Sequence, residues 1–155
     1  MIWEELDERL IFLNRTESSR EELLKMAGEA FVHSGAAKSG YPQALLCREK
    51  DFPTGLDAGV FGIAIPHTES CWVERNTLGI LVLRDPVEFI KMGTEKETIP
   101  VKLIFILAVK PGSDHIKRLK RIMAILQDQG LLKRISEAEN KKEIMEMIRR
   151  KEELL

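Results

Sequence analysis

The histidine at position 67 stands directly after a short apolar run, in the octapeptide Gly62–Glu69, which reads GIAIPHTE. Ile63, Ile65 and the ring of Pro66 give the imidazole rigid apolar surroundings, and proline fixes the approach of the chain because its φ is locked. A neutral imidazole keeps one nitrogen free to attack while a hydrogen bond holds the other. His67 therefore suits nucleophilic catalysis or general base work. The octapeptide alone fits a structural histidine that caps a strand-end carbonyl equally well.

Two further histidines complete the set of three. His115 lies in the tetrapeptide GSDH, after the strongest apolar run and at the predicted start of a helix. Because backbone N–H groups at a helix N-terminus favour anions, His115 could donate to an oxyanion or phosphate near His67. Taken alone, it is typical of a solvated first-turn residue. His33 precedes Gly35 at the predicted end of a helix, where we expect a structural role.

A charged pair, Arg48–Glu49, lies in the segment CREKDFPTG (47–55). A guanidinium is always charged and forks onto phosphate oxygens. A neighbouring carboxylate can fix the tautomer of a histidine or orient the arginine. The alternative is a solvated surface pair, which is the commoner fate of such residues.

Length and composition indicate a globular chain. The 155 residues, 44% hydrophobic and 32% charged, fit a single domain covering 1–155. The net charge of −1 gives no basic field for nucleic acid, so no such partner is expected. The longest unbroken apolar run, Leu103–Val109, is too short to span a membrane, and the N-terminus lacks the features of a signal peptide. A cytoplasmic location without membrane insertion is therefore expected.

The apolar pattern predicts an α/β fold in which helices cover a mixed sheet. Short β-branched runs bounded by turn residues predict strands at 10–14, 60–65, 77–83 and 101–109, with a weaker candidate at 87–90 between the turn signals Asp85–Pro86 and Met92–Gly93. Apolar residues at helical spacing predict helices at 18–34, from Pro42 to about 52, from Ser113 to Gly130, over LLKRI (131–135) and at 141–154.

The two cysteines form no C-x-x-C motif, so free thiols are expected. A metal site made by His67, Cys71 and His115 is one alternative function, although only one pair has ligand-like spacing. A phosphocysteine is another, but Cys47 falls within a predicted helix and Cys71 follows the turn after His67, so neither fits a phosphate-cradling loop at a strand end. Cys71 is instead expected to be a small buried apolar residue.

The motif R-E-x-x-x-P-T-G-L (48–56), followed by G-I-A-I-P-H (62–67), resembles the type-2 IIA family of the bacterial phosphoenolpyruvate-dependent sugar phosphotransferase system, the mannitol/fructose class. The segment PQALLCREKDFPTGL (42–56) is similar in sequence to the galactitol-specific branch. The resemblance runs from about residue 6 to near residue 150. It implies a mixed β-sheet flanked by helices on both faces, a three-layer α/β/α arrangement.

The resemblance also implies an activity. In this family the phosphocarrier HPr passes a phosphoryl group to a IIA histidine, and IIA passes it to a cysteine of IIB, which phosphorylates sugar during uptake through the membrane component IIC. By motif, His67 is the phosphoacceptor, His115 the second active-site histidine and Arg48 the family arginine. The Thr54 hydroxyl is expected to donate to the phosphoryl oxygens, and Glu49 to stand behind them, since a carboxylate repels phosphate. The family reaction needs no metal or other cofactor.

The surface around the histidine is expected to dock both protein partners in turn. Phe52, Leu56 and Phe61 are the predicted apolar contacts, with Asp57 and Glu69 as an acidic rim that speeds association. The galactitol branch often carries a polar residue in place of the second histidine, whereas this chain keeps it, as the mannitol and fructose branches do. The same fold and histidine also occur in regulatory proteins of the nitrogen-related phosphotransferase system, so a regulatory role stays an alternative.

Overall fold

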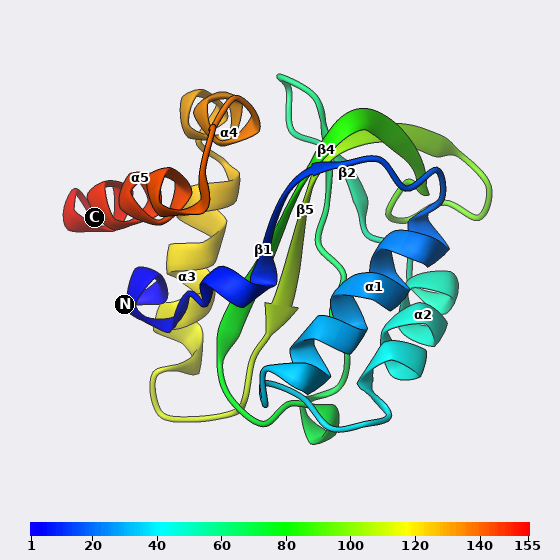
Figure 1. The fold of residues 1–155 in the computed structure, drawn as a ribbon, viewed down its shortest axis with the longest axis horizontal. Coiled ribbons are helices and arrows are strands. Elements are labelled where there is room, and N and C mark those ends of the chain that lie inside the picture. Colours follow the sequence, from blue (N-terminus) through cyan, green and yellow to red (C-terminus); the bar gives the residue numbers. More distant parts are fainter.

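A five-stranded mixed sheet forms the centre of the computed structural model, which describes residues 1–155 (Figure 1). Its spatial order is β1-β4-β5-β3-β2. The strands are β1 (Ile11–Arg15), β2 (Gly55–Asp57), β3 (Gly62–Ala64), β4 (Thr77–Ile90) and β5 (Thr98–Ala108). β1 runs parallel to β4, and β3 parallel to β5, while the β4–β5 and β2–β3 pairs are antiparallel.

Helices cover both faces of this sheet, which confirms the three-layer arrangement (Figure 1). The helices are α1 (Arg20–His33), α2 (Tyr41–Asp51), α3 (His115–Leu126), α4 (Gln129–Ser136) and α5 (Lys141–Glu153), and three short 3-10 turns are η1 (Ile2–Glu5), η2 (Glu8–Leu10) and η3 (Ser70–Trp72). One apolar core lies between α1–α2 and the sheet, and a second lies between the sheet, α3–α5 and η1. No helix is long and apolar enough to cross a membrane.

The helix boundaries follow the expected local signals. The Ser19 side chain caps α1 by accepting the N–H of Glu22 at 3.2 Å, and Gly35 adopts φ +80° just beyond its end. Pro42 occupies the first turn of α2. The helix that was predicted to run to Gly130 ends earlier, because α3 and α4 are separated at Gln127–Asp128. The Asp128 side chain caps α4 by accepting the N–H of Leu131, and Gly130 lies inside α4.

The strand predictions need four corrections. β4 continues through Asp85–Pro86, which was expected to be a turn, because a bulge between Val82 and Val87 accommodates a proline that cannot donate to the ladder. β2 was missed, since three residues are too few to show a period. β3 is shorter than the predicted strand at 60–65, and β1 begins one residue late, after η2.

β3 delivers the histidine segment to one edge of the sheet. Gly62 fits there because an added Cβ would lie 2.2 Å from the carbonyl oxygen of Pro100 on β5. β3 and β5 are parallel, so both have their carboxyl ends at this edge. The segment after β3 leads to His67, and the segment after β5 leads to His115 at the start of α3. The topology therefore brings the two histidine-bearing segments to the same end of the molecule.

Candidate functional site

His67 is held at the sheet edge by its own backbone. Three residues beyond β3, it forms an isolated β-bridge with Leu107, and the carbonyl of Pro66 accepts the N–H of Leu107 at 3.0 Å. The half-buried ring lies with Nδ1 3.0 Å from the carbonyl oxygen of Ile65. A carbonyl can only accept, so Nδ1 carries a proton, and in the neutral imidazole Nε2 therefore keeps its lone pair. The geometry thus prepares Nε2 as a nucleophile.

Glu49 and Thr54 brace this turn from behind. The Glu49 carboxylate is 6% exposed and accepts both the Thr54 N–H, at 2.7 Å, and the Thr54 hydroxyl, at 2.5 Å. The same hydroxyl oxygen accepts the N–H of Ile65 at 3.1 Å. Burial raises the pKa of Glu49, although the Thr54 hydrogen bonds act in the opposite direction. A chain of hydrogen bonds therefore links the end of α2 to the peptide that holds His67.

The hydrogen bonds of Thr54 and Glu49 define the role of each residue. Thr54 is buried and its only hydroxyl proton is donated to Glu49, so no proton remains for a phosphoryl oxygen. Thr54 supports the turn instead. Glu49 reaches the His67 turn only through its hydrogen bonds to Thr54.

Arg48 reaches the segment after His67. Its guanidinium stacks over the ring of Phe52 at 4.1 Å from the centroid, and Nη1 lies 3.5 Å from the Glu69 carboxylate. That pair is exposed on the Glu69 side and therefore weak. The Nε atom of Arg48 is buried without a partner. A planar cation is thus oriented beside this segment, with donor capacity left for an anion.

His115 is the first residue of α3 and is half-buried. Its Nδ1 atom is buried and has no hydrogen-bond partner, and Asp114 makes no side-chain capping bond. The first-turn N–H groups of α3 are therefore not capped by a side chain, which leaves them suited to a negative group. No hydrogen bond joins His115 to His67.

The predicted docking residues fall into two groups. Phe52 and Glu69 lie beside Arg48 and line the same surface hollow, together with Trp72 of η3. Asp57 and Phe61 belong to the β2–β3 hairpin, at the amino end of β3, whereas His67 follows its carboxyl end. The structure does not bring these two residues to the histidine. Figure 1 shows the hairpin at the top, near α4, and η3 at the bottom.

The sequence predicted an apolar face on the helix that starts near Ser113, but not that a stripe of this face on α3 is exposed. Ile116, Leu119 and Met123 are 70%, 36% and 44% exposed, at the spacing of one helix face. Met123 also lines a groove with Leu56 of β2, which makes Leu56 part of this surface. The signal was present in the sequence, but helical spacing alone does not separate an exposed stripe from a core face.

The cysteines stand away from any metal-binding group. Cys47 lies on α2, as predicted, and both thiols are free and exposed. The expectation that Cys71 is buried is wrong, because η3 turns it to the surface. No group of three or more His, Cys, Asp or Glu side chains is placed to hold a metal ion.

Comparisons with known proteins show what the chain resembles in sequence. It is 31% identical, over 88% of its length and 90% of the relative, to a mannitol-specific phosphotransferase enzyme IIA component of Staphylococcus aureus. It is 28% identical to the galactitol-specific EIIA component of Escherichia coli K12, over 73% of this chain and 75% of that one. A nitrogen regulatory protein of Bradyrhizobium diazoefficiens is 32% identical, over 78% and 76%. The match to the E. coli mannitol-specific EIICBA component, at 30% identity over 89% of this chain, spans only 21% of that longer protein.

Solved structures share the fold. The crystal structure of IIA mannitol from E. coli aligns with a TM-score of 0.72 at 26% identity, over 92% of this chain and 97% of that one. IIA in the E. coli complex of enzyme IIA-mannitol with phosphorylated enzyme IIB-mannitol aligns with a TM-score of 0.73, over 92% and 95% of the two chains, at 26% identity. The model of the phosphoenolpyruvate-dependent sugar phosphotransferase system EIIA 2 family matches residues 4–151, and the chain therefore belongs to this family of phosphotransfer components.

Proposed function

We propose that this chain is a sugar-specific IIA component that accepts a phosphoryl group from phospho-HPr on Nε2 of His67 and passes it to a cysteine of a IIB component. The observation that carries the proposal is the hydrogen bond of the His67 Nδ1–H to the Ile65 carbonyl, which puts the lone pair of the neutral imidazole on Nε2. The phosphoryl group is carried covalently, with no metal or other cofactor. The reaction takes place in the cytoplasm, with residues 1–155 acting as one domain and without contact to nucleic acid or insertion into a membrane.

Both transfers balance at the imidazole. The Nε2 lone pair attacks the phosphorus of phospho-HPr, the P–N bond to the HPr histidine breaks, and its electron pair returns to that histidine. A IIB thiolate then attacks the same phosphorus, and His67 leaves as a neutral imidazole whose Nδ1–H is still hydrogen-bonded to the Ile65 carbonyl. The proton on Nδ1 therefore never has to move during either step.

Electrostatic stabilisation supplies most of the rate. Phosphoryl transfer passes through a loose transition state whose charge spreads over three equatorial oxygens. Arg48 is oriented by Phe52 and contributes a forked donor. His115 and the uncapped first turn of α3 contribute further N–H groups from the other side. The approach of a phosphoryl group displaces Glu69 from Arg48, because the Arg48–Glu69 pair is exposed and weak.

HPr and IIB dock in turn on one surface, which we assign to Phe52 and Glu69 on the α2 side and to Leu56 and the α3 stripe on the other. Asp57 lines the same groove as Leu56 and Met123 and belongs to this surface with them, whereas Phe61 lies at the amino end of β3, away from His67. Alternating partners require a small interface with fast exchange. The membrane component IIC is reached only indirectly, through IIB.

The substrate class is a sugar alcohol. The segment PQALLCREKDFPTGL favours galactitol as the substrate. The sequence identity of the chain to a mannitol-specific relative, 31%, is similar to its identity to the galactitol-specific one, 28%. The two are separated by the acceptor: phosphorylated chain is offered to a galactitol IIB and to a mannitol IIB, and the faster acceptor identifies the sugar.

Intact-mass measurement tests the main proposal. The chain is incubated with phosphoenolpyruvate, enzyme I and HPr, with His67→Ala and His115→Ala in parallel. Wild type gains one acid-labile phosphoryl group, His67→Ala gains none, and His115→Ala gains it more slowly. If wild type gains none, the carrier function is excluded.

A regulatory role is the second candidate, favoured by the similarity to a nitrogen regulatory protein. The chemistry at His67 is the same in both roles, so the decisive step is the next one. A sugar carrier loses its phosphoryl group rapidly to a IIB cysteine, whereas a regulator keeps it in the presence of galactitol and mannitol IIB components.

A further inference from the structure

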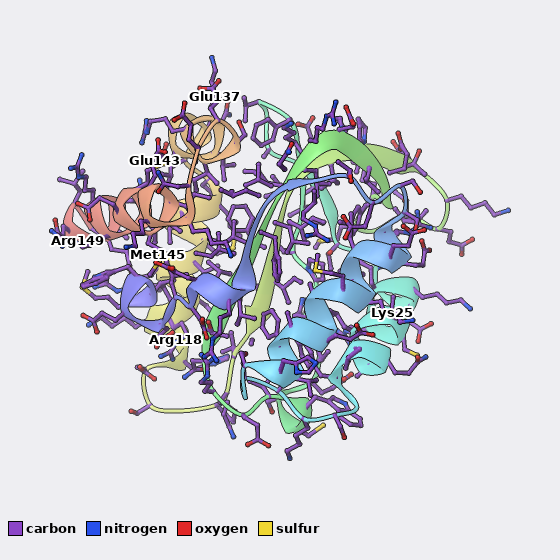
Figure 2. The ribbon with its side chains drawn as sticks, in the orientation of Figure 1. Lys25, Arg118, Glu137, Glu143, Met145 and Arg149 are labelled. Carbon is purple, nitrogen blue, oxygen red and sulfur yellow. The ribbon has the colours of Figure 1, made fainter.

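Arg118 joins three segments of the chain. Its guanidinium donates to both carboxylate oxygens of Glu5, with Nη2–Oε1 at 2.5 Å and Nε–Oε2 at 3.3 Å, and Nη1 donates to Oδ1 of Asp114 at 3.2 Å. The Arg118 side chain is only 10% exposed. Figure 2 shows Arg118 between α3 and the N-terminal turn η1. A fork onto a carboxylate fixes direction as well as distance.

Glu5 is itself firmly anchored. Its carbonyl oxygen accepts the hydroxyl of Thr77, at the start of β4, at 2.8 Å. The buried carboxylate of Glu152, on α5, accepts the N–H groups of Ile2 and Trp3 at 2.8 and 2.7 Å. η1 is thus tied to the sheet and to α5, so that Glu5 offers Arg118 a fixed point.

The start of α3 has little other support. Residues 111–114 are exposed, as are Ile116 and Lys117 in the first turn. Asp114 provides no side-chain cap, and the His115 Nδ1 atom has no partner to hold the ring. The position of His115 therefore depends on where the first turn of α3 lies. Arg118 is the charged side chain that ties this turn to the rest of the fold.

We propose that Glu5 and Arg118, with Asp114, are positioning residues that place His115 beside the phosphoryl group on His67. The proposal rests on the proposed carrier function. Neither Glu5 nor Arg118 touches the phosphoryl group. Their effect passes through the orientation of the first turn of α3, so it is lost when His115 is absent.

The first test is a double-mutant cycle of Glu5→Gln with His115→Ala, read by single-turnover transfer from phospho-HPr. At saturating phospho-HPr, Glu5→Gln slows the chemical step by about tenfold, because small misplacements are costly in transfer reactions. In the His115→Ala background the same change has less than about a twofold effect. Glu4→Gln is the matched control, since Glu4 lies in the same turn, is 57% exposed and forms its ion pair with the terminal amine. An equal loss in both backgrounds, or no loss in either, overturns the proposal.

The second test does not depend on phosphoryl transfer. The imidazole resonances of His115, followed by NMR in the unphosphorylated protein, shift in Glu5→Gln and in Arg118→Lys, which keeps the charge but loses the fork. They stay in place in Glu4→Gln. Unshifted resonances in both test variants overturn the proposal even if the carrier function holds. If wild type accepts no phosphoryl group, the carrier function fails, while this measurement still decides whether the network places His115.

Discussion

The Nδ1 atom of His67 lies 3.0 Å from the carbonyl oxygen of Ile65, two residues earlier in the chain. The bond closes within the turn that contains Pro66, so the local sequence sets the tautomer. The N–H of Ile65 donates to the hydroxyl oxygen of Thr54 at 3.1 Å. Ile65 and Thr54 therefore connect the nucleophile to the buried carboxylate of Glu49.

The tautomer of His67 predicts the site of phosphorylation. Because Nδ1 carries the proton, the phosphoryl group is expected on Nε2 alone. Nitrogen–phosphorus couplings in the labelled, phosphorylated chain identify the bonded nitrogen. Phosphorylation at Nδ1 would show that the Ile65 hydrogen bond breaks during catalysis.

The parts of the site that are close in sequence were predictable, and those that depend on long-range contacts were not. Arg48 and His67 can be identified from the sequence because each lies in a short motif that contains proline and glycine. The occupation of the Thr54 hydroxyl by Glu49 and Ile65 depends on how the end of α2 meets β3, which no local pattern encodes. The same is true of Glu5 and Arg118, 113 residues apart.

Removing the Thr54 hydroxyl is expected to weaken both the fold and the reaction. Thr54→Val keeps the shape of the side chain but leaves the Ile65 N–H and one Glu49 oxygen unpaired in a buried place. The expected loss is about 2 kcal/mol in the free energy of unfolding, measured by urea denaturation, together with slower phosphorylation of His67. Thr54→Ser is the control, because it keeps the hydroxyl. Equal stability of the Val and Ser variants would mean that the hydrogen bonds contribute nothing.

The carboxyl group of Glu49 predicts a pH dependence. Burial raises the pKa of Glu49 above its ordinary value of 4.5. The folded chain thus favours the protonated form of Glu49. The stability that this carboxyl group contributes is fully present below pH 4.5 and is lost as the pH rises through the raised pKa. Relative to Glu49→Gln, wild type should therefore lose stability as the pH increases from about 4 towards neutrality. Urea midpoints of both proteins across this range provide the measurement, and a difference that grows in favour of wild type would reverse the assigned direction.

Apolar strands were predictable where both faces of the sheet are covered. β4 and β5 have unbroken buried stretches, since helices pack on each side of the sheet, and such runs are visible in the sequence. The continuation of β4 through Asp85–Pro86 was not predictable, because it depends on a bulge opposite β5. Local turn signals favour a break there, and pairing with the neighbouring strand overrides them.

The stripe on α3 predicts a specific defect in docking. Ile116 is 70% exposed, so Ile116→Glu should leave the fold intact while placing a charge in the interface with HPr and IIB. The KM for phospho-HPr is expected to rise about tenfold, with little change in kcat, because an interface contact is lost and the chemical groups are unchanged. Leu154→Glu is the matched control, as Leu154 is 86% exposed beyond the end of α5. Identical KM values for the two variants would remove α3 from the docking surface.

Arg48 tests whether the shape of the cation matters as well as its charge. The guanidinium stacks on Phe52, and its fork can bind two phosphoryl oxygens at once, whereas a lysine offers one compact ammonium. Arg48→Lys is therefore expected to slow transfer to His67 by about tenfold to a hundredfold in single-turnover kinetics, because a donor aimed at the transition state is lost. Arg150→Lys, on a side chain that is 76% exposed on α5, controls for the substitution itself and should transfer at the wild-type rate. A wild-type rate in Arg48→Lys would reduce Arg48 to a general positive charge, and the stabilisation of the equatorial oxygens would then fall to His115 and the first turn of α3.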